Sequence, residues 1–364
     1  MTEQHSVALV ELSDHHGECI YPQLRFLASA GIPVHLVCSE AVAARLRGTE
    51  AAASLATFRF GRGTGRDLPE IWRVRRHLLD LGVDTVVLNT ARGSRVRNLM
   101  LLPTGRLRFV GVAHIANKLS GGSTQFVVGR KTHTFLVLND YILPHVRVTP
   151  ASRVAGIYLI YFPPYRPLPV PKPKGEFWVC IPGQVEFKKR DYEALFDRIS
   201  ERSPDRGVQF VMPGAGPPTD RDGQRLREIL DARGLTARFR LWDDFVDHDT
   251  FFSVLAASDL IMPLIHPRKP SHEEYLKYKV SGTFNLAFGF SLPMFCEESF
   301  AGIDDFDAGC LFYKESNLVE RLNRLVRNPQ PLADTRARLA AYSKFDFETQ
   351  RQRYLEALFP DDAV

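Results

Sequence analysis

The sequence predicts an α/β protein made of two Rossmann-like domains, each with a parallel sheet, joined by a proline-rich linker. Three observations support this prediction. Apolar strand-like segments alternate with amphipathic helix-like segments, as in βαβ units. The chain has 364 residues, of which 45% are hydrophobic, and this length favours two domains. Six prolines between positions 163 and 173 divide the alternation into two halves.

The first half contains five expected strands and three expected helices. The strands are 6–12, 32–39, 83–90, 107–116 and 132–140, and the helices are 20–31, 68–82 and 95–103. Gly31 and Gly82 close the first two helices, and Pro103 stops the third. The prolines that follow predict a stiff linker over 161–176.

The alternation restarts after the linker. The expected strands are 177–183, 208–214, 237–245, 260–265 and 292–298, and the expected helices are 191–202, 221–234, 248–259, 317–328 and 331–359. Another helix is expected in the second half of "YLKYKVSGTFNLAFGF" (275–290), with Phe284, Ala287 and Phe288 in the core. The expected division is a domain at 1–160, the linker, a domain at 177–340 and a terminal helix at 341–364.

The bulk composition limits the function classes. The net charge is +5, but residues 1–160 carry 19 basic and 11 acidic residues, a balance of +8. Such a basic half suits an acidic substrate, an anionic membrane surface or nucleic acid, while a solvated arginine-rich surface is the alternative. The basic residues do not alternate with aromatic ones on a recognisable module, so a nucleic-acid partner is not expected.

The start of the chain and the cysteines point to a cytoplasmic protein. We find no signal-peptide pattern and no run of 18 apolar residues. The five cysteines are odd in number and form no C-x-x-C pair, so we expect reduced thiols and no structural zinc.

The loop "SDHHGECIYP" (13–22) after the first strand holds candidates for a general base. Ligands of open α/β sheets bind beyond the carboxyl ends of strands. His15, His16 and Glu18 lie at such an end, and histidine titrates near neutral pH. The alternative is a polar loop whose Asp14 caps the next helix.

Two further strand ends in the first half carry groups that suit an anionic substrate. Arg92 and Arg95 follow the third strand, and arginine binds anions through paired hydrogen bonds. His114 and Asn117 follow the fourth strand. A solvated helix face and a packed core histidine are the respective alternatives.

The second half has glycines and cations after its strands. Gly183 and the cations Lys188, Lys189 and Arg190 follow the first of these strands, and Gly214 follows the second. Glycine permits close approach of the backbone to a ligand. The sequence contains neither G-x-G-x-x-G, nor G-x-x-x-x-G-K-[ST], nor G-x-S-x-G.

The start of the helix within 275–290 combines small residues with a cation. Lys279, Ser281 and Gly282 lie there, and a helix N-terminus attracts anions such as phosphate. By contrast, Asp247 and Asp249 are expected to cap a helix rather than to bind a metal ion. We therefore expect no metal site.

These features together resemble the GT-B class of glycosyltransferases. The resemblance rests on two Rossmann-like domains, the linker, the terminal helix, and the segments "IPGQVEFKKR", "FVMPGAG", "LWDDFVDHDTFFSVLAASDLIMPLI" and "YKVSGTFNLAFGFSLPMF". It implies that 177–340 binds a nucleotide-sugar donor, with the diphosphate at the helix near Ser281 and the base near Phe245 and Val246. It also implies that 1–160 binds the acceptor and that the terminal helix crosses back to it.

The sequence departs from the retaining subgroup of that class, because the Glu-x7-Glu pair is missing around the 281–290 helix. Asn285 is a candidate contact to the ribose instead. The resemblance then favours an inverting, metal-independent transferase in which His15, His16 or Glu18 is the base. No cofactor is expected besides the nucleotide-diphosphate sugar as donor substrate. The acceptor could be a small molecule, a glycan or a lipid-linked molecule, and the basic first domain could contact the inner face of a membrane.

Two other functions fit the same architecture. A sugar-nucleotide epimerase or hydrolase would act without an acceptor. A two-lobed binding protein would bind the sugar nucleotide without catalysis, although the histidine-rich first loop argues against this.

Overall fold

A computed structural model describes residues 5–61, 67–148, 152–214, 216–244 and 246–360. The chain divides into two units. The first unit comprises Met1–Pro164, Tyr278–Val280 and Asp346–Val364, and the second comprises Tyr165–Lys277 and Ser281–Phe345. The boundary near Pro164 falls within the proline-rich segment. The short return of Tyr278–Val280 to the first unit has no counterpart in the sequence prediction.

The first unit is built on a parallel sheet of seven strands in the order β3-β2-β1-β4-β5-β6-β7. Its strands are β1 (Val7–Glu11), β2 (Val34–Ser39), β3 (Ser54–Phe58), β4 (Thr85–Leu88), β5 (Arg108–Ala113), β6 (Thr132–Leu138) and β7 (Arg153–Ile157). Its α-helices are α1 (Ile20–Ser29), α2 (Glu40–Ala43), α3 (Leu68–Asp80), α4 (Ser94–Leu101), α5 (Gly122–Lys131) and α14 (Phe347–Leu358).

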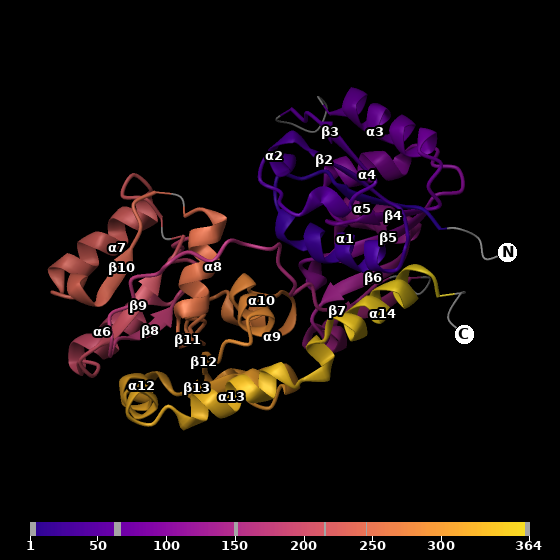
Figure 1. Ribbon diagram of the computed structural model, residues 1–364. Helices are drawn as coiled ribbons and strands as arrows, with labels where there is room; N and C mark the ends of the chain where they lie inside the picture. Colours follow the sequence, from indigo (N-terminus) through magenta and orange to yellow (C-terminus); the bar gives the residue numbers. More distant parts are fainter. Residues whose placement is uncertain (1–4, 62–66, 149–151, 215, 245, 361–364) are drawn as a thin grey trace. The chain divides into compact units, whose positions relative to one another are not determined.

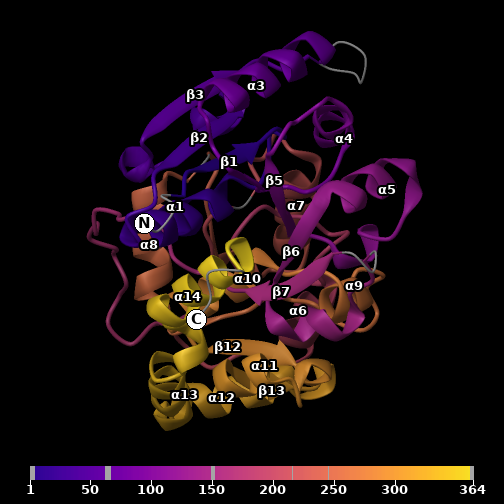
Figure 2. The same ribbon diagram turned by 90° about the vertical axis from the view of Figure 1, so that its right-hand side faces the viewer.

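Both faces of this sheet are covered, so its central strands β1 and β4 are buried along their whole length. Successive residues of β1 enter different cores: Ala8 packs with α3, α4 and α5, whereas Leu9 packs with α1 and α14. Figure 2 shows these two groups of helices on opposite sides of the sheet. Tyr354 and Leu358 of α14 are fully buried in the second of these cores. The predicted return of the terminal helix to the first domain is therefore confirmed.

The second unit has a parallel sheet of six strands in the order β10-β9-β8-β11-β12-β13. Its strands are β8 (Phe177–Cys180), β9 (Val208–Met212), β10 (Phe239–Leu241), β11 (Leu260–Ile261), β12 (Met294–Glu297) and β13 (Cys310–Tyr313). Its α-helices are α6 (Tyr192–Glu201), α7 (Arg221–Ala232), α8 (His248–Ala257), α9 (His272–Lys277), α10 (Gly282–Gly289), α11 (Asp304–Gly309), α12 (Leu318–Arg327) and α13 (Gln330–Ala340).

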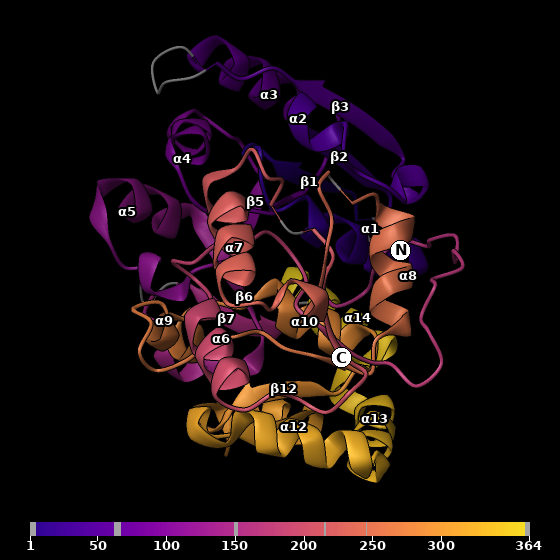
Figure 3. The same ribbon diagram turned by 90° about the vertical axis from the view of Figure 1, so that its left-hand side faces the viewer.

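The helices of the second unit also cover both faces of the sheet. Figure 1 shows α6 and α7 on one side and α8 and α10 on the other. Figure 3 shows α12 and α13 side by side next to β12. Phe284, Ala287 and Phe288 of α10 are buried, as predicted. Asp247 caps α8, because its carboxylate accepts hydrogen bonds from the backbone N–H groups of Asp249 and Thr250 at 3.0 and 3.1 Å.

Three predicted elements differ clearly from the structure. The helix expected over 331–359 is instead α13 and α14, separated by a 3₁₀ turn at Ser343–Phe345. Phe345 stacks on Phe288 in the second unit at 4.5 Å, whereas Tyr354 lies in the core of the first. The strands expected over 237–245 and 260–265 are shorter in the structure, since β10 ends at Leu241 and β11 ends at Ile261.

The order of the strands marks where ligands bind in each unit. In the first sheet the direction of winding reverses between β1 and β4, and in the second between β8 and β11. Crevices at such switch points, beyond the carboxyl ends of the strands, are the usual ligand sites of this architecture. No helix in the described part of the chain is long and apolar enough to cross a membrane.

Candidate functional site

The switch point of the first unit brings together three residues singled out in the sequence. The rings of His16 and His114 stack with centroids 3.8 Å apart and an interplanar angle of 18°. His16 Nδ1 lies 3.3 Å from a carboxylate oxygen of Glu18. His16, Glu18 and His114 form what we call the histidine cluster. His15 is exposed, and its ring lies edge-on to His16 at 6.4 Å.

Hydrogen bonds fix the protonation pattern of the histidine cluster. The carbonyl oxygen of Asn89 lies 2.7 Å from His114 Nε2 and can only accept, so this nitrogen carries the proton. Desolvation and then the neighbouring His16 lower the pKa of His114 to about 4, so its ring is neutral at physiological pH. Partial desolvation acts to raise the pKa of Glu18, but His16 and His114 outweigh it and the pKa is lowered. The Glu18 carboxylate can accept a hydrogen bond from His16 Nδ1–H, and in that tautomer Nε2 is the nitrogen without a proton.

A buried polar network supports the loop that carries His16. Glu11 is fully buried and accepts hydrogen bonds from Asn89 Nδ2 at 2.7 Å, Thr90 Oγ1 at 2.6 Å and the backbone N–H of Ser13 at 2.7 Å. Asn89 Nδ2 also donates to the carbonyl oxygen of His16 at 2.8 Å. His16 itself has a left-handed backbone, with φ of 63°. The network therefore holds a strained backbone at a candidate catalytic residue.

The pKa of His114 makes the stability of the first unit depend on pH. Its pKa is about 6.5 in the unfolded chain and about 4 in the folded chain, so the unfolded chain binds more protons between these values. The stabilisation is fully present above about pH 6.5 and is lost as the pH falls towards 4. Urea unfolding at neutral pH and at about pH 5 should show a smaller loss of stability in His114→Gln than in the wild type. An equal loss in both proteins would contradict the depressed pKa.

The predicted acceptor arginines differ in their surroundings. Arg95 donates to Asp67 at 2.8 Å, to the carbonyl oxygen of Leu12 at 2.7 Å and to that of Gly61 at 3.1 Å. All of its nitrogen atoms are thus used within the first unit, and it has a structural role. Arg92 is exposed at the start of the segment before α4. Asn117 is also exposed, in the 3₁₀ turn Ala116–Lys118.

The structural role of Arg95 predicts a stability effect. Asp67 is 4% exposed as a side chain, so Arg95→Ala leaves a buried carboxylate without its cation. The free energy of unfolding of the first unit should fall by about 3 kcal/mol. The exposed Arg92→Ala should change it by less than about 0.5 kcal/mol. Urea unfolding followed by circular dichroism measures both, and equal effects would contradict the assignment.

The switch point of the second unit forms a small cradle from three segments. Gly183 and Gly214 have φ of 91° and 81°, and a Cβ atom on Gly214 would lie only 3.4 Å from Gly183 Cα. The Arg190 guanidinium crosses beside them: Nη2 donates to the carbonyl oxygen of Pro182 and to Thr283 Oγ1, the latter at 3.2 Å. Thr283 lies in the first turn of α10. We call Gly183, Arg190, Gly214 and this first turn the glycine–arginine cradle.

The start of α10 is open to a ligand. Ser281 caps the helix through its Oγ atom, which accepts from the N–H of Thr283 at 3.4 Å. Gly282 is exposed, and a Cβ atom on it would meet nothing within 4 Å. In the part of the chain that the structure describes, Arg190 Nη1 and Asn285 Oδ1 are buried atoms with no hydrogen-bond partner. A positive helix end, a guanidinium and free polar atoms suit an anionic, hydroxylated ligand.

The remaining predicted donor residues have other contacts in the structure or cannot be placed. Lys189 pairs with Glu186 at 2.6 Å. Lys188 is exposed and lines a surface hollow with residues of α7. Lys279 belongs to the first unit, where it pairs with Ile115 in an antiparallel bridge. Val246 is buried in the loop before α8, and Phe245 lies outside the described residues.

The sequence prediction named Arg190 only as one of three cations in a loop, and it missed two other kinds of residue. Arg190 stands in the same cationic run as the two lysines, but the spacing did not show which of the three turns inward. Glu11 is the last residue of β1 and Asn89 directly follows β4, and that position was the only available signal. Asn139, at the carboxyl end of β6, is fully buried with φ of 67°, and neither polar atom of its side chain has a partner among the described residues.

One group in the second unit has the chemistry of metal ligands. Single atoms of Asp191, His266 and Glu315 lie within 4.8 Å of one another. Arg268 already donates to Asp191, through Nη2 at 2.8 Å and through Nε, and its Nη1 lies 3.9 Å from Glu315. The guanidinium of Arg268 therefore supplies positive charge to the carboxylates of both Asp191 and Glu315. Although burial acts to raise the pKa of Asp191, His266 and Arg268 hold it well below its usual range.

Comparisons with known proteins agree with this architecture. No protein-family model and no curated protein matches the sequence. Among solved structures, HepE from Anabaena in complex with UDP superposes with a TM-score of 0.68 at 14% identity, over 97% of this chain and 99% of that chain. Sucrose-phosphate synthase from Thermosynechococcus elongatus gives 0.65 at 14% identity, over 96% and 97%. A UDP-N-acetylglucosamine 2-epimerase gives 0.63 at 12% identity, over 98% and 96%. The chain therefore has the two-domain GT-B fold that glycosyltransferases and UDP-N-acetylglucosamine 2-epimerases share.

Proposed function

We propose that the protein is a glycosyltransferase that moves a sugar from a nucleotide-diphosphate sugar to an acceptor hydroxyl. One observation carries the proposal. Arg190 places a buried nitrogen without a partner among the described residues at the open N-terminus of an α-helix, beside Gly183, whose φ is positive. A diphosphate offers the negative charge and the acceptor oxygens that such a cradle needs.

The nucleotide that fits this proposal is UDP. HepE was solved with UDP, and with UDP and glucose, and it shares the fold over nearly the whole chain. In our proposal the diphosphate binds Arg190 and the first turn of α10. Asn285 Oδ1 accepts a hydrogen bond from a ribose hydroxyl, because a buried carbonyl oxygen without a partner favours a donor. The loop at Val246 contacts the uracil.

The proposed mechanism rests on charge. Cleavage of the bond between sugar and phosphate builds negative charge on the departing UDP. Arg190 and the helix dipole stabilise that charge without a metal ion. In the first unit, His16 Nε2 takes the proton of the acceptor hydroxyl while Glu18 stabilises the resulting imidazolium. A base that activates the acceptor for direct displacement gives inversion at the anomeric carbon.

The shared fold favours one second candidate. A UDP-N-acetylglucosamine 2-epimerase superposes on this chain almost as well as the transferases do. An epimerase or hydrolase would use the same diphosphate cradle but no acceptor. The two functions therefore differ in products rather than in nucleotide binding.

The experiment that tests the proposal follows both donor and product. The protein is incubated with a panel of UDP-sugars, with and without candidate acceptor alcohols. NMR then follows the signals of the transferred sugar, including its anomeric carbon. A transferase gives a glycoside and UDP only when the acceptor is present. An isomerised UDP-sugar or free sugar without acceptor would identify the second candidate. Binding of UDP without any turnover would leave a sugar-nucleotide-binding protein.

A further inference from the structure

The exposed large hydrophobic side chains gather on one layer of helices in the first unit. Six are exposed among the described residues, by 37% to 61%, and all six lie in the first unit. Five of them belong to α3, α4 or α5, namely Leu68, Trp72, Leu79, Leu101 and Phe126. These helices cover one face of the sheet (Figure 2), and α4 contacts both α3 and α5. Single exposed hydrophobic residues are ordinary, but this concentration indicates that the three helices, which we call the α3–α4–α5 layer, form an interaction surface.

Helix α3 carries one apolar stripe more than its own packing requires. The buried stripe lies in the core of the first unit and consists of Ile71, Val74 and Leu78. Trp72 and Leu79 are about two turns apart and therefore share another side of the helix. Trp72 is 52% exposed, and the exposed Arg76 lies between the two on the same side. A surface helix needs one apolar stripe for its core, so the second stripe is available to a partner.

Contacts between the helices bring the exposed groups together. Leu101, the last residue of α4, is 61% exposed. The carbonyl oxygens of the two residues that follow it accept hydrogen bonds from cations of the neighbouring helices. Arg75 Nε of α3 donates to Pro103, and Lys131 Nζ of α5 donates to Leu102 at 3.3 Å. The end of α4 is thus flanked by cations from both α3 and α5.

The same layer is positively charged. Helices α3, α4 and α5 contain seven arginine and lysine residues and two acidic residues, whereas α1, α2 and α14 on the other face of the sheet contain three of each. Three of the seven cations pair with Glu70, Asp80 and Asp67. The cations that form no ion pair among the described residues are Arg75, Arg97, Arg130 and Lys131. An anionic partner would therefore be attracted to this layer.

Cations also lie over the two exposed aromatic rings. The guanidinium of Arg75 lies 5.2 Å from the ring centroid of Trp72, and that of Arg130 lies 5.6 Å from the ring centroid of Phe126. Phe126 is 60% exposed. Arginine beside tryptophan, phenylalanine and leucine is typical of protein surfaces that lie at the boundary between lipid headgroups and acyl chains.

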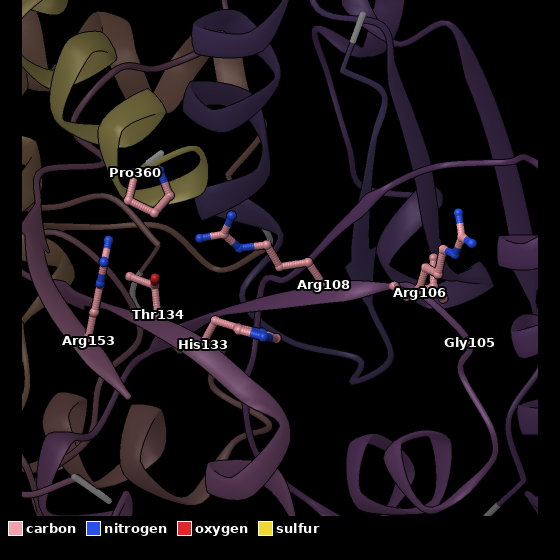
Figure 4. A pocket seen from close by; sticks show the side chains of 8 residues that line it. Gly105, Arg106, Arg108, His133, Thr134, Arg153 and Pro360 are labelled. Carbon is pink, nitrogen blue, oxygen red and sulfur yellow. The ribbon is translucent and has the colours of Figure 1, made fainter. Parts of the chain in front are cut away.

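Charge alone does not single out this layer. Arg106, Arg108 and Arg153 line a hollow at the amino ends of β5, β6 and β7 (Figure 4). None of the exposed large hydrophobic side chains lines that hollow. In the described part of the first unit, several cations together with several exposed apolar side chains are therefore found on the α3–α4–α5 layer.

We propose that the α3–α4–α5 layer binds the surface of an anionic lipid bilayer. Trp72, Leu101 and Phe126 enter the interface between headgroups and acyl chains, and the cations bind lipid phosphates. A lipid surface accepts apolar side chains that protrude from helices, whereas a protein partner needs a pocket for each anchor. A twofold dimer through this layer would set two positive surfaces face to face, which is unfavourable. Because the layer lies wholly in the first unit, its binding to lipid does not depend on the proposed function.

The test sediments the full chain with vesicles of phosphatidylcholine alone and of phosphatidylcholine mixed with phosphatidylglycerol. The wild type should bind the mixed vesicles at least about tenfold more tightly than the neutral ones. Trp72→Ala/Phe126→Ala should weaken binding to the mixed vesicles about 10- to 100-fold, because two large side chains no longer leave water. Leu101→Ala and Arg130→Gln should each weaken it about fivefold. Circular dichroism checks that each variant is folded.

Two control variants remove matched groups from the other face of the same sheet. Leu55 in β3 is 48% exposed, and the next residue, Ala56, packs in the core beneath α3, so Leu55 points to the other face. Arg25 is exposed on α1. Leu55→Ala and Arg25→Gln should bind the mixed vesicles within about twofold of the wild type, because neither group reaches the lipid.

Fluorescence tests whether Trp72 enters the lipid. Brominated lipids in the mixed vesicles should quench part of the tryptophan emission of the wild type, and Trp72→Phe should lose most of this quenching. The other two tryptophans, Trp178 and Trp242, lie in the second unit.

Three results would overturn the proposal: a wild type that does not bind the mixed vesicles, control variants that lose as much affinity as the layer variants, or quenching that persists in Trp72→Phe. Light scattering then identifies the other occupants. A dimer that Trp72→Ala/Phe126→Ala dissociates, without vesicle binding, would assign the layer to a second copy of the chain. A monomer that binds no vesicles would leave an acidic protein as the partner, and both results contradict the lipid surface.

Discussion

Arg190→Ala is expected to raise the Kd for UDP by about 10- to 100-fold. Arg190 is the cation that reaches the first turn of α10, through Thr283 Oγ1 at 3.2 Å, and its Nη1 atom has no partner among the described residues. A hydrogen bond to a charged group contributes about 1.5–3 kcal/mol, and each 1.4 kcal/mol changes the affinity tenfold. Isothermal titration calorimetry with UDP measures the effect directly.

The neighbouring lysines provide matched controls. Lys188→Ala and Lys189→Ala remove the same charge from the same loop, but Lys188 is exposed and Lys189 is paired with Glu186. Both variants should bind UDP within about threefold of the wild type. If either lysine variant lost more affinity than Arg190→Ala, the diphosphate would lie nearer to the surface of the loop than we propose.

His16→Ala is expected to lower the rate of sugar transfer by about 10²- to 10⁴-fold at saturating donor. The reason is the loss of the imidazole that Glu18 orients at 3.3 Å and that stacks on His114. The affinity for UDP should stay unchanged, because the donor cradle consists of residues of the second unit. Turnover is measured by UDP release and binding by calorimetry.

Variants of Glu18 and His15, the other two candidates in the loop 13–22, test which of the three residues is the base. Glu18→Gln keeps the shape of the side chain but not its charge, so it should give a smaller loss than His16→Ala. His15→Ala should retain most of the activity, because its ring is exposed and no hydrogen bond from the ring occurs among the described residues. A larger loss of rate in His15→Ala than in His16→Ala would overturn the choice of base.

Most of the fold could be predicted from the sequence, because strands buried on both faces are continuous apolar runs and glycine ends the helices. Short elements were missed. β7 ("RVAGI") is rich in small residues, and β13 ("CLFY") has only four. The break between α13 and α14 was also missed, since periodicity shows which face is apolar but not which core will bury it.

The site was predicted less completely. His16, Glu18 and His114 could be selected as candidates because they follow strands, whose carboxyl ends lie at one edge of the sheet. The choice among Lys188, Lys189 and Arg190 depends on the path of a loop, which spacing does not determine. Lys279 lies three residues before α10 in sequence, yet its backbone is hydrogen-bonded within the first unit, where its carbonyl oxygen accepts from Tyr141 at 3.0 Å.

A crystal structure with UDP tests the central claim most directly. We predict diphosphate oxygens within hydrogen-bonding distance of Arg190 Nη1 and of the backbone N–H of Gly282, with the ribose beside Asn285. A diphosphate bound elsewhere, for example on the hollow beside Lys188 and α7, would contradict the account.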